Sequence, residues 1–199
     1  MLPFYNHFRF IVHVIYLHGF CSSSQSFKAQ LVQQYVDSQS EHSVYSIDLP
    51  FAPADAMSLI ETHISTLKDI NWAVVGSSLG GYYATYLSEK YQVNAVLINP
   101  AVKAYTLLEH VLGENTNYHS GEVFNFTREH LSQLERFFIS TITRPEKLLL
   151  LTQTADEVLD YVQGVEYYNK AKQTIVEGGS HGFDDYEDYL EQTFTHLAG

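Results

Sequence analysis

The pentapeptide Gly-Ser-Ser-Leu-Gly at residues 76–80 constrains the fold more than any other part of the sequence. It has the pattern G-x-S-x-G and lies between an apolar run at 72–75 and a helix-compatible segment at 81–87. In that setting the pattern predicts a tight strand–turn–helix with Ser78 in strained backbone and its side chain forced outward. The flanking glycines let the strand and the helix pass without a collision of Cβ atoms. Taken alone, the pentapeptide also fits an ordinary glycine-rich turn.

The rest of the chain alternates short apolar runs with longer amphipathic segments. Most of the runs are continuously apolar, as expected for parallel strands that are buried on both faces. This alternation predicts an α/β fold with three layers, a doubly wound and mostly parallel sheet of about six strands, and right-handed crossovers. The expected strands are residues 13–17, 44–47, 72–75, 95–98, 148–151 and 174–176.

Three of the amphipathic segments show a clear apolar stripe at helical spacing. The first stripe consists of Phe27, Leu31, Tyr35 and Val36, the second of Met57, Ile60, Ile64 and Leu67, and the third of Tyr186, Tyr189, Leu190, Phe194 and Leu197. We expect Asp55 to be the N-cap of the second helix, and Asp184 or Asp185 to cap the third.

Length and composition predict one domain over residues 1–199, because a chain of 199 residues that is 45% hydrophobic can form one full core. The net charge of −12 and the lack of a lysine and arginine cluster argue against nucleic acid and anionic membrane as partners. The apolar N-terminal run is too short to span a bilayer. A single cysteine, Cys21, excludes an intrachain disulfide and suits a reducing cytoplasm. The sequence does not indicate the oligomeric state.

The alternation of strands and helices is interrupted at about residues 100–146. This stretch has helical pieces and many aromatic residues but no clear strand. An insertion between the fourth and fifth strands lies over the carboxyl edge of such a sheet, where ligands bind. It is read either as a peripheral helical pair or as a small helical cap over an apolar acyl pocket. For that pocket we expect contributions from Tyr105, Tyr118 and Cys21, although Cys21 also fits a simple buried thiol.

Ser78 needs a base and an orienting acid, which in this architecture follow it along the chain on loops after strands. His181 lies on a glycine-flanked loop after the last strand, and we expect it to exchange the proton of Ser78. Asp156, after the strand at 148–151, is expected to orient His181. Asp160 is the next candidate for the acid, and Glu157 lies close by in the same acidic loop.

The oxyanion hole is expected to use two backbone amides, one of them from Leu79, directly after the nucleophile. The second should come from the loop after the first strand, where we assign Phe20, with Cys21 as the alternative. His18 is expected to serve as a structural hydrogen-bonding residue. No zinc motif, phosphate loop or dinucleotide fingerprint is present, so we expect neither a metal nor a cofactor.

Five segments together resemble the YqiA-type small bacterial esterases (UPF0227-like) of the α/β-hydrolase superfamily. They are Ile-Tyr-Leu-His-Gly-Phe at 15–20, Gly-Ser-Ser-Leu-Gly-Gly-Tyr-Tyr-Ala-Thr at 76–85, Leu-Ile-Asn-Pro-Ala-Val at 97–102, Gln-Thr-Ala-Asp-Glu-Val-Leu-Asp-Tyr at 153–161 and Val-Glu-Gly-Gly-Ser-His at 176–181. The resemblance implies a cytoplasmic serine esterase that acts on short acyl esters or thioesters, with Ser78, Asp156 and His181 as its triad and a compact cap.

The chain departs from the pattern of that family at three places. Cys21 replaces the usual asparagine, Ala155 replaces the glycine before the acid, and Lys103-Ala104 replaces an arginine–proline pair. The first and third departures bear on substrate preference, and the second bears on the placement of the acid.

Three functions fit this reading. The leading hypothesis is hydrolysis of short-chain carboxylic esters or thioesters. Acyl transfer or C–C bond cleavage on the same triad is the second, since the acceptor that reaches the acyl-enzyme decides the outcome. A non-catalytic hydrolase-fold binding protein is the third, although such proteins usually lack a triad residue and this chain has all three.

Overall fold

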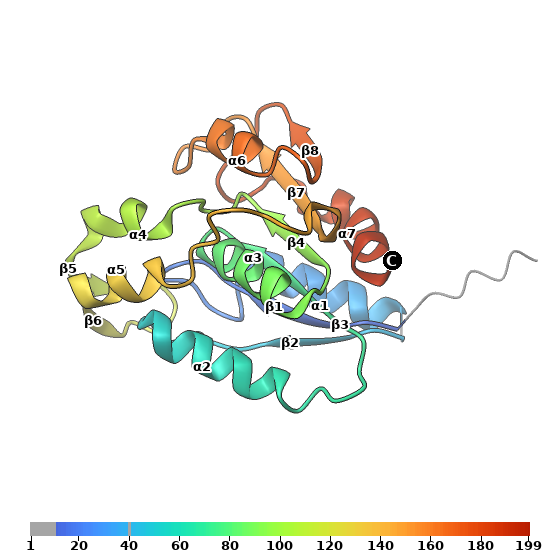
Figure 1. Ribbon diagram of the computed structural model, residues 1–199, viewed down its shortest axis with the longest axis horizontal. Coiled ribbons are helices and arrows are strands. Elements are labelled where there is room, and N and C mark those ends of the chain that lie inside the picture. Colours follow the sequence, from blue (N-terminus) through green and yellow to red (C-terminus); the bar gives the residue numbers. More distant parts are fainter. Residues whose placement is uncertain (1–10, 40) are drawn as a thin grey trace, which may run out of the picture.

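One parallel sheet of six strands, in the order β2-β1-β3-β4-β7-β8, runs through the computed structural model, which describes residues 11–39 and 41–199 (Figure 1). The predicted domain also includes residues 1–10 and 40, which lie outside the described residues. The strands are β1 (His13–Leu17), β2 (Ser43–Ser46), β3 (Trp72–Ser77), β4 (Ala95–Ile98), β7 (Leu148–Gln153) and β8 (Lys172–Val176), and β5 (Gly113–Thr116) and β6 (Val123–Phe126) form a separate pair. The helices are α1 (Phe27–Gln39), α2 (Pro53–Ile64), α3 (Leu79–Tyr91), α4 (Ala104–Leu107), α5 (Arg128–Glu135), α6 (Tyr161–Tyr167) and α7 (Leu190–Ala198), with short 3-10 turns η1 (Leu108–Val111), η2 (Pro145–Lys147) and η3 (Tyr186–Tyr189).

The central strands are apolar at successive positions because each of their faces packs against helices. Ile15, Val74 and Leu97 belong to the core on the side of α2 and α3. Their neighbours in sequence, such as Val75 and Val96, belong to a second core with residues of α1 and α7. Successive side chains of a strand point to opposite faces, so continuous apolar strands build a three-layer structure. The predicted fold class is confirmed.

The strand order changes direction between β1 and β3. From β1 the chain crosses to β2 on one side, and it then returns to β3 on the other side of β1. The loops that follow β1 and β3 therefore diverge at the carboxyl edge of the sheet and leave a crevice, which is where ligands bind in open parallel sheets. The loops after β7 and β8 reach the same edge, because all six strands are parallel.

The insertion between β4 and β7 contains α4 and α5, as expected, but also a hairpin that the sequence analysis did not find. Strands β5 and β6 pair antiparallel, with Gly113 opposite Phe126. In β6, Phe124 and Phe126 are buried whereas Val123 and Asn125 are exposed. This strict alternation is the signal of a half-buried strand, but a strand of four residues is too short to stand out in an aromatic-rich segment. The insertion is thus a mixed cap and not a purely helical one.

Several predicted strands end at different residues in the structure. Strands β1 and β4 match the expected ranges, whereas β2 begins one residue earlier and ends one residue earlier. Strands β3 and β7 continue through polar Ser77 and Gln153, and β8 begins at Lys172. The ladder extends over these residues because Ser77 pairs with Ile98, and Gln153 pairs with Val176. Apolarity therefore marked the centres of the strands but not their ends.

Two predicted helix features are wrong in detail. In α1 the buried residues are Ala29, Val32 and Val36, while Phe27, at 63% exposure, points to solvent. The first apolar stripe was therefore displaced by about one residue around the helix. For α2 the N-cap is Ala52, and Pro53 begins the helix, so Asp55 lies in the first turn instead. The second stripe is buried as predicted, although its last residue follows the end of α2.

The third stripe is split between two elements. The η3 turn carries its first part and α7 carries the remainder, and three of its residues in α7 are buried. Asp185 holds the cap position of η3 but makes no side-chain cap hydrogen bond. Asp184 instead accepts a hydrogen bond from the hydroxyl of Ser180, at 2.6 Å. Neither aspartate therefore caps the last helix as predicted, because the chain turns sharply there around the loop that follows β8.

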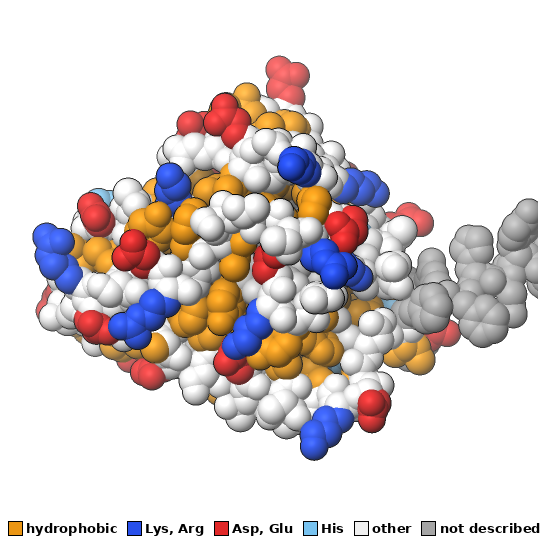
Figure 2. All heavy atoms as spheres, viewed as in Figure 1, with side chains coloured by type: hydrophobic (Ala, Val, Ile, Leu, Met, Phe, Trp, Pro, Cys, Tyr) orange, Lys and Arg blue, Asp and Glu red, His pale blue; other side chains and the backbone are white. Residues whose placement is uncertain are grey.

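On the face shown in Figure 2, lysine and arginine side chains are interspersed with aspartate and glutamate, and hydrophobic side chains lie between them. No single patch of positive charge covers that face. Within the described part of the chain, every helix is too short or too polar to cross a lipid bilayer.

Candidate active site

The backbone at Ser78 has the strained geometry that the G-x-S-x-G pattern predicts. Ser78 directly follows β3 and precedes α3, with φ 54° and ψ −117°. Positive φ is uncommon for residues other than glycine, so the surrounding structure must hold Ser78 in this conformation. The amide of Ser78 donates to the carbonyl of Ile98, and its own carbonyl accepts from Ala101 at 3.1 Å. Both bonds anchor the turn to the end of β4.

The flanking glycines are required because backbone passes directly beside them. A Cβ added at Gly76 would lie 2.2 Å from the carbonyl oxygen of Gly80. A Cβ at Gly80 would lie 2.0 Å from the carbonyl oxygen of Leu17, at the end of β1. Neither position accepts a side chain without a backbone shift, so the motif is a packing requirement as well as a turn.

The structure brings the three predicted triad residues together at the carboxyl edge of the sheet. His181 Nε2 lies 3.1 Å from Ser78 Oγ. On the other side of the ring, Nδ1 lies 2.9 Å from Oδ2 and 3.0 Å from Oδ1 of Asp156. An ionised carboxylate can only accept, so Nδ1 carries the proton and the lone pair of Nε2 faces the serine hydroxyl. This is the tautomer that a general base needs.

Asp156 is held as a carboxylate within the protein. Its side chain is 2% exposed, against 23% for that of His181. Burial by itself raises the pKa of Asp156, but hydrogen bonds from His181 and from the amides of Leu159 and Val158 outweigh it and leave the pKa lowered. Those two amides lie 2.8 Å and 2.9 Å from Oδ1. The acid therefore stays charged opposite the imidazole.

The other acidic side chains of this loop have separate structural roles. Asp160 accepts from the amide of Val162 at 3.0 Å and is the N-cap of α6. Glu157 accepts from the backbone amide of His181 at 2.9 Å. The geometry thus places Asp156, and neither of its neighbours, beside the imidazole ring.

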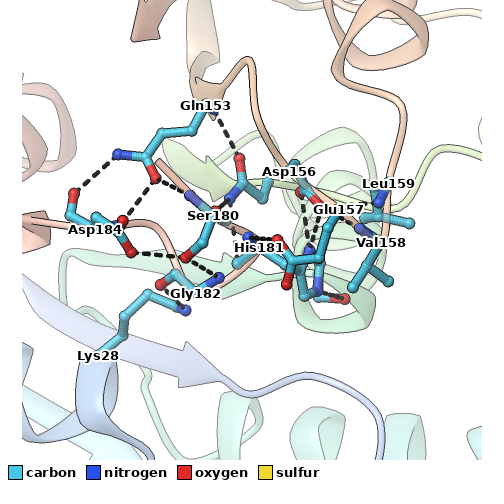
Figure 3. A network of polar contacts seen from close by, with 12 residues as sticks. Lys28, Gln153, Asp156, Glu157, Val158, Leu159, Ser180, His181, Gly182 and Asp184 are labelled. Carbon is cyan, nitrogen blue, oxygen red and sulfur yellow. Dashed lines mark hydrogen bonds and ion pairs between the residues drawn. The ribbon is translucent and has the colours of Figure 1, made fainter. Parts of the chain in front are cut away.

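Buried amide side chains hold the loop that carries His181 by several hydrogen bonds, and those of Gln153 are drawn in Figure 3. Gln153 accepts from the amides of Ser180 and Asp184 at 3.0 Å and 2.8 Å, and it donates to the carbonyl of Asp184. Asn99 donates to the carbonyls of Ser180 and His181. The glycine-flanked loop is therefore held in place over the edge of the sheet.

Sequence reasoning missed Asn99 and Gln153 as supports of the site. Both are almost completely buried, and Asn99 Oδ1 also accepts from the amide of Gln153 at 3.0 Å. The available signal was their position, since each is a polar residue directly at the carboxyl end of an apolar strand. A glycine is needed beside them, because a Cβ at Gly179 would lie 2.0 Å from Gln153 Oε1.

The loop after β1 lies directly against the nucleophile. A Cβ at Gly19 would be 3.3 Å from the Cβ of Ser78. His18 accepts from the amide of Leu49 through Nε2, so its Nδ1 carries the proton and donates to the carbonyl of Gly19. Burial lowers the pKa of His18, which favours this neutral form. His18 is therefore a structural bridge, as expected.

The two amides expected to form the oxyanion hole lie on this loop and at the start of α3. Among the described residues, no protein acceptor takes a hydrogen bond from the amide of Phe20 or from that of Leu79. The ring of Phe20 packs edge-on against Phe124 and Phe126 of the cap hairpin, with centroids 5.9 Å and 5.3 Å apart. The hairpin thereby fixes the position of Phe20, the residue expected to supply one of the two amides.

A further residue that the sequence analysis missed, Asn117, joins the hairpin turn to the same loop. Asn117 Nδ2 donates to the carbonyl of Ser22, and its Oδ1 accepts from the amides of His119 and Ser120. The amide of Tyr118 also lies 3.4 Å from the carbonyl of Cys21. The hairpin turn therefore links the cap by hydrogen bonds to the loop after β1, in which the second oxyanion-hole amide is expected (the oxyanion loop).

Two openings are lined by residues that follow the strands at the carboxyl edge of the sheet. A narrow pocket with a volume of about 30 Å³ is lined by Phe20, Cys21, Leu79, Tyr83 and Phe124 among others. A wider groove of about 220 Å³ runs between the start of the cap and the loop after β7. Its walls include Pro100, Ala101, Val102, Leu107 and Leu159. The two openings therefore differ several-fold in volume.

Of the three residues expected in the substrate pocket, only Cys21 lines the narrow pocket. Tyr105 packs its ring against Phe138, with centroids 5.5 Å apart, and lines neither opening. Tyr118 belongs to the hairpin turn, and the residue is 86% exposed. Burial raises the pKa of the Cys21 thiol, so its environment does not favour a reactive thiolate.

The structure accounts for the sequence departures noted above. Cys21 has a φ of 54°, a conformation in which asparagine is enriched, so the backbone accepts either residue at some strain for cysteine. Ala155 does not have a positive φ, so its Cβ leaves the acid in reach of His181. Lys103 is exposed and lines the wider groove, while Ala104 is buried.

A parallel sheet with a serine at the elbow after β3, an acid after β7 and a histidine after β8 defines the α/β-hydrolase fold. The sequence model of the family described as "Uncharacterised protein family (UPF0227)" matches residues 13–198, and the chain belongs to this family, as the resemblance implied.

Solved structures agree with this fold. A putative hydrolase from Agrobacterium vitis S4 is similar with a TM-score of 0.77 at 19% identity, over 95% of this chain and 88% of that one. Est1E from Butyrivibrio proteoclasticus is similar with a TM-score of 0.72 at 16% identity, over 96% and 88%. For a monoacylglycerol lipase from Paleococcus ferrophilus the TM-score is 0.67 at 17% identity, over 92% and 94%.

Proposed function

We propose that the protein is a serine hydrolase that cleaves short-chain carboxylic esters or thioesters through an acyl-enzyme. The observation that carries the proposal is the continuous line of hydrogen bonds from Asp156 through His181 to Ser78, with 2.9 Å and 3.1 Å between the bonded atoms. Such a line can activate a serine hydroxyl, which is otherwise a poor nucleophile at neutral pH. The monoacylglycerol lipase among the structures with this fold is in keeping with an ester as substrate.

In this mechanism Ser78 Oγ attacks the carbonyl carbon while its proton passes to His181 Nε2. Asp156 holds the ring in the required tautomer and stabilises the imidazolium that forms. The amides of Phe20 and Leu79 donate hydrogen bonds to the negatively charged oxygen of the tetrahedral intermediate. His181 then returns the proton to the leaving alcohol or thiol. Water then attacks the acyl-enzyme while one of its protons passes to His181. His181 returns this proton to Ser78 Oγ as the bond to the acyl group breaks and the acid is released.

The size of the openings supports a preference for short acyl groups. A cavity needs about 10–15 Å³ to hold one water molecule, so a pocket of about 30 Å³ accepts only a few heavy atoms. That pocket lies beside Phe20 and Leu79, next to the proposed position of the carbonyl oxygen. We assign the short acyl group to it, and the groove of about 220 Å³ to the larger leaving group.

The test uses p-nitrophenyl esters from acetate to octanoate with the wild-type protein and two serine variants. Ser78→Ala should lower kcat by several orders of magnitude. Ser77→Ala is the matched control, because Ser77 is the adjacent serine and is buried in β3. A fluorophosphonate probe should label the wild type and Ser77→Ala but not Ser78→Ala. Ester hydrolysis that persists in Ser78→Ala would reject the nucleophile assignment.

A further inference from the structure

A lysine of α1 contacts the histidine loop, the segment after β8 that carries His181. Lys28, the second residue of α1, lies with its Nζ 2.6 Å from the carbonyl oxygen of Gly182 (Figure 3). Gly182 directly follows His181, so this bond joins two segments that are 154 positions apart in sequence. The mechanism described above gives Lys28 no role.

The bond completes the set of contacts that hold this loop. The amide of His181 donates to Glu157, and its carbonyl accepts from Asn99. The amide of Gly182 lies 3.2 Å from Ser180 Oγ, which leaves the carbonyl of Gly182 as the acceptor for Lys28. All of the other partners come from the sheet edge or from the loop itself. Lys28 is the partner supplied by the helix that follows the oxyanion loop.

Asp156 is the charged group that acts on Lys28, and the elements beside it carry further acidic side chains. Asp156 is on the loop after β7, His181 and Asp184 are on the loop after β8, and η3, which contacts α1, adds exposed Glu187 and Asp188. Burial lowers the pKa of Lys28 to about 8, and the charge of Asp156 opposes this effect in part. Lys28 is therefore charged at neutral pH and loses its proton at mildly alkaline pH.

We propose that Lys28 is a positioning residue for the general base, whose ammonium holds the Gly182 carbonyl and thereby the backbone from which His181 reaches Ser78. This inference rests on the proposed function. Lys28 touches neither Ser78 Oγ nor the pockets that would hold substrate, so it acts on the rate through His181. A charged donor makes a stronger hydrogen bond than a neutral one, so the restraint weakens when the amine loses its proton.

The experiment measures kcat and KM for p-nitrophenyl acetate from pH 6 to 10 in the wild type, Lys28→Met, Lys28→Arg and Lys68→Met. Lys68 is an exposed lysine, so its variant controls for the change in net charge. Lys28→Met should lower kcat about 10- to 100-fold at pH 7, the range for one hydrogen bond to a charged group, with KM unchanged. The kcat of the wild type should fall as the pH rises through about 8, and Lys28→Arg should remove that fall, because arginine stays charged.

Hydrogen exchange gives a second readout that needs neither activity nor a variant. In the wild type, the amides of residues 181–184 should lose protection between pH 7 and pH 9, after correction for intrinsic exchange rates. Unchanged protection, or Lys28→Met kinetics equal to those of Lys68→Met in an active enzyme, would overturn the inference and leave the proposed function standing. A wild type that neither hydrolyses the ester nor reacts with a fluorophosphonate would count against the proposed function itself.

Discussion

Gly80 and Leu17 are in direct backbone contact: a Cβ built on Gly80 would lie 2.0 Å from the carbonyl oxygen of Leu17. Gly80 belongs to the first turn of α3, and Leu17 is the last residue of β1. The contact brings the start of the helix that follows Ser78 against the strand that leads into the loop containing Phe20. The relative positions of Ser78 and Phe20 therefore depend on the absence of one side chain.

Replacement of Gly80 by alanine should destabilise the protein, because the new methyl group meets backbone that cannot rotate away. We expect a loss of about 1–3 kcal/mol or more in the free energy of unfolding, measured by urea denaturation. Gly164→Ala is the matched control, since Gly164 lies within α6 and a Cβ there meets no atom within 4 Å. That variant should gain about 0.5–1 kcal/mol from helix propensity. Equal stabilities of the two variants would contradict the contact.

Replacement of Asp156 by asparagine should lower kcat about 10³- to 10⁴-fold with little change in stability. An amide can donate to Nδ1, so the imidazole can adopt the wrong tautomer and present a proton to Ser78. The matched control is Asp160→Asn, since asparagine also caps helices well and Asp160 only caps α6. Steady-state kinetics on p-nitrophenyl acetate compares the two. A large loss in Asp160→Asn with none in Asp156→Asn would reverse the assignment of the acid.

The free energy of unfolding should decrease as the pH falls below about 6.5. Burial lowers the pKa of His13, His18, His63 and His196 from their usual value of 6.5. Above pH 6.5 these rings are neutral whether the chain is folded or unfolded, and their contribution is complete. Below it the unfolded chain binds protons that the folded chain does not, so stability falls toward the lower pKa values of the folded state. Urea denaturation at pH 7.5, 6.5 and 5.5 measures the slope.

The His13–His63 pair offers a specific test of that slope. Their Nε2 atoms lie 2.9 Å apart, so one ring donates to the other and at least one must stay neutral. His63→Gln should reduce the loss of stability between pH 7.5 and 5.5, because glutamine accepts no proton. His110→Gln, at an exposed position in the cap, is the control and should leave the slope unchanged. A steeper slope in His63→Gln would contradict this explanation.

Parts of the cap differ from what the sequence predicts. It predicted helical pieces at residues 100–146, and α4 and α5 are present. It did not predict the β5–β6 hairpin, because the two strands of four residues are each too short to stand out from an aromatic-rich segment. The hairpin is defined by what it packs against, since Phe124 and Phe126 meet Phe20 from a distant loop. Tyr105 lines neither of the two openings described above, and its ring packs on Phe138.

What the sequence by itself determined are features with a local physical cause: the strained turn at Ser78, the apolar strands, and the order of Ser78, Asp156 and His181 on loops after them. Glycines beside a tight turn and runs of residues buried on two faces leave a pattern that is readable along the chain. Only the tertiary structure decided which side chains hold the loop that carries His181, because Asn99, Gln153 and Lys28 reach it across 27 to 154 positions of sequence. Such contacts depend on how strands and helices pack, and no spacing along the chain encodes them.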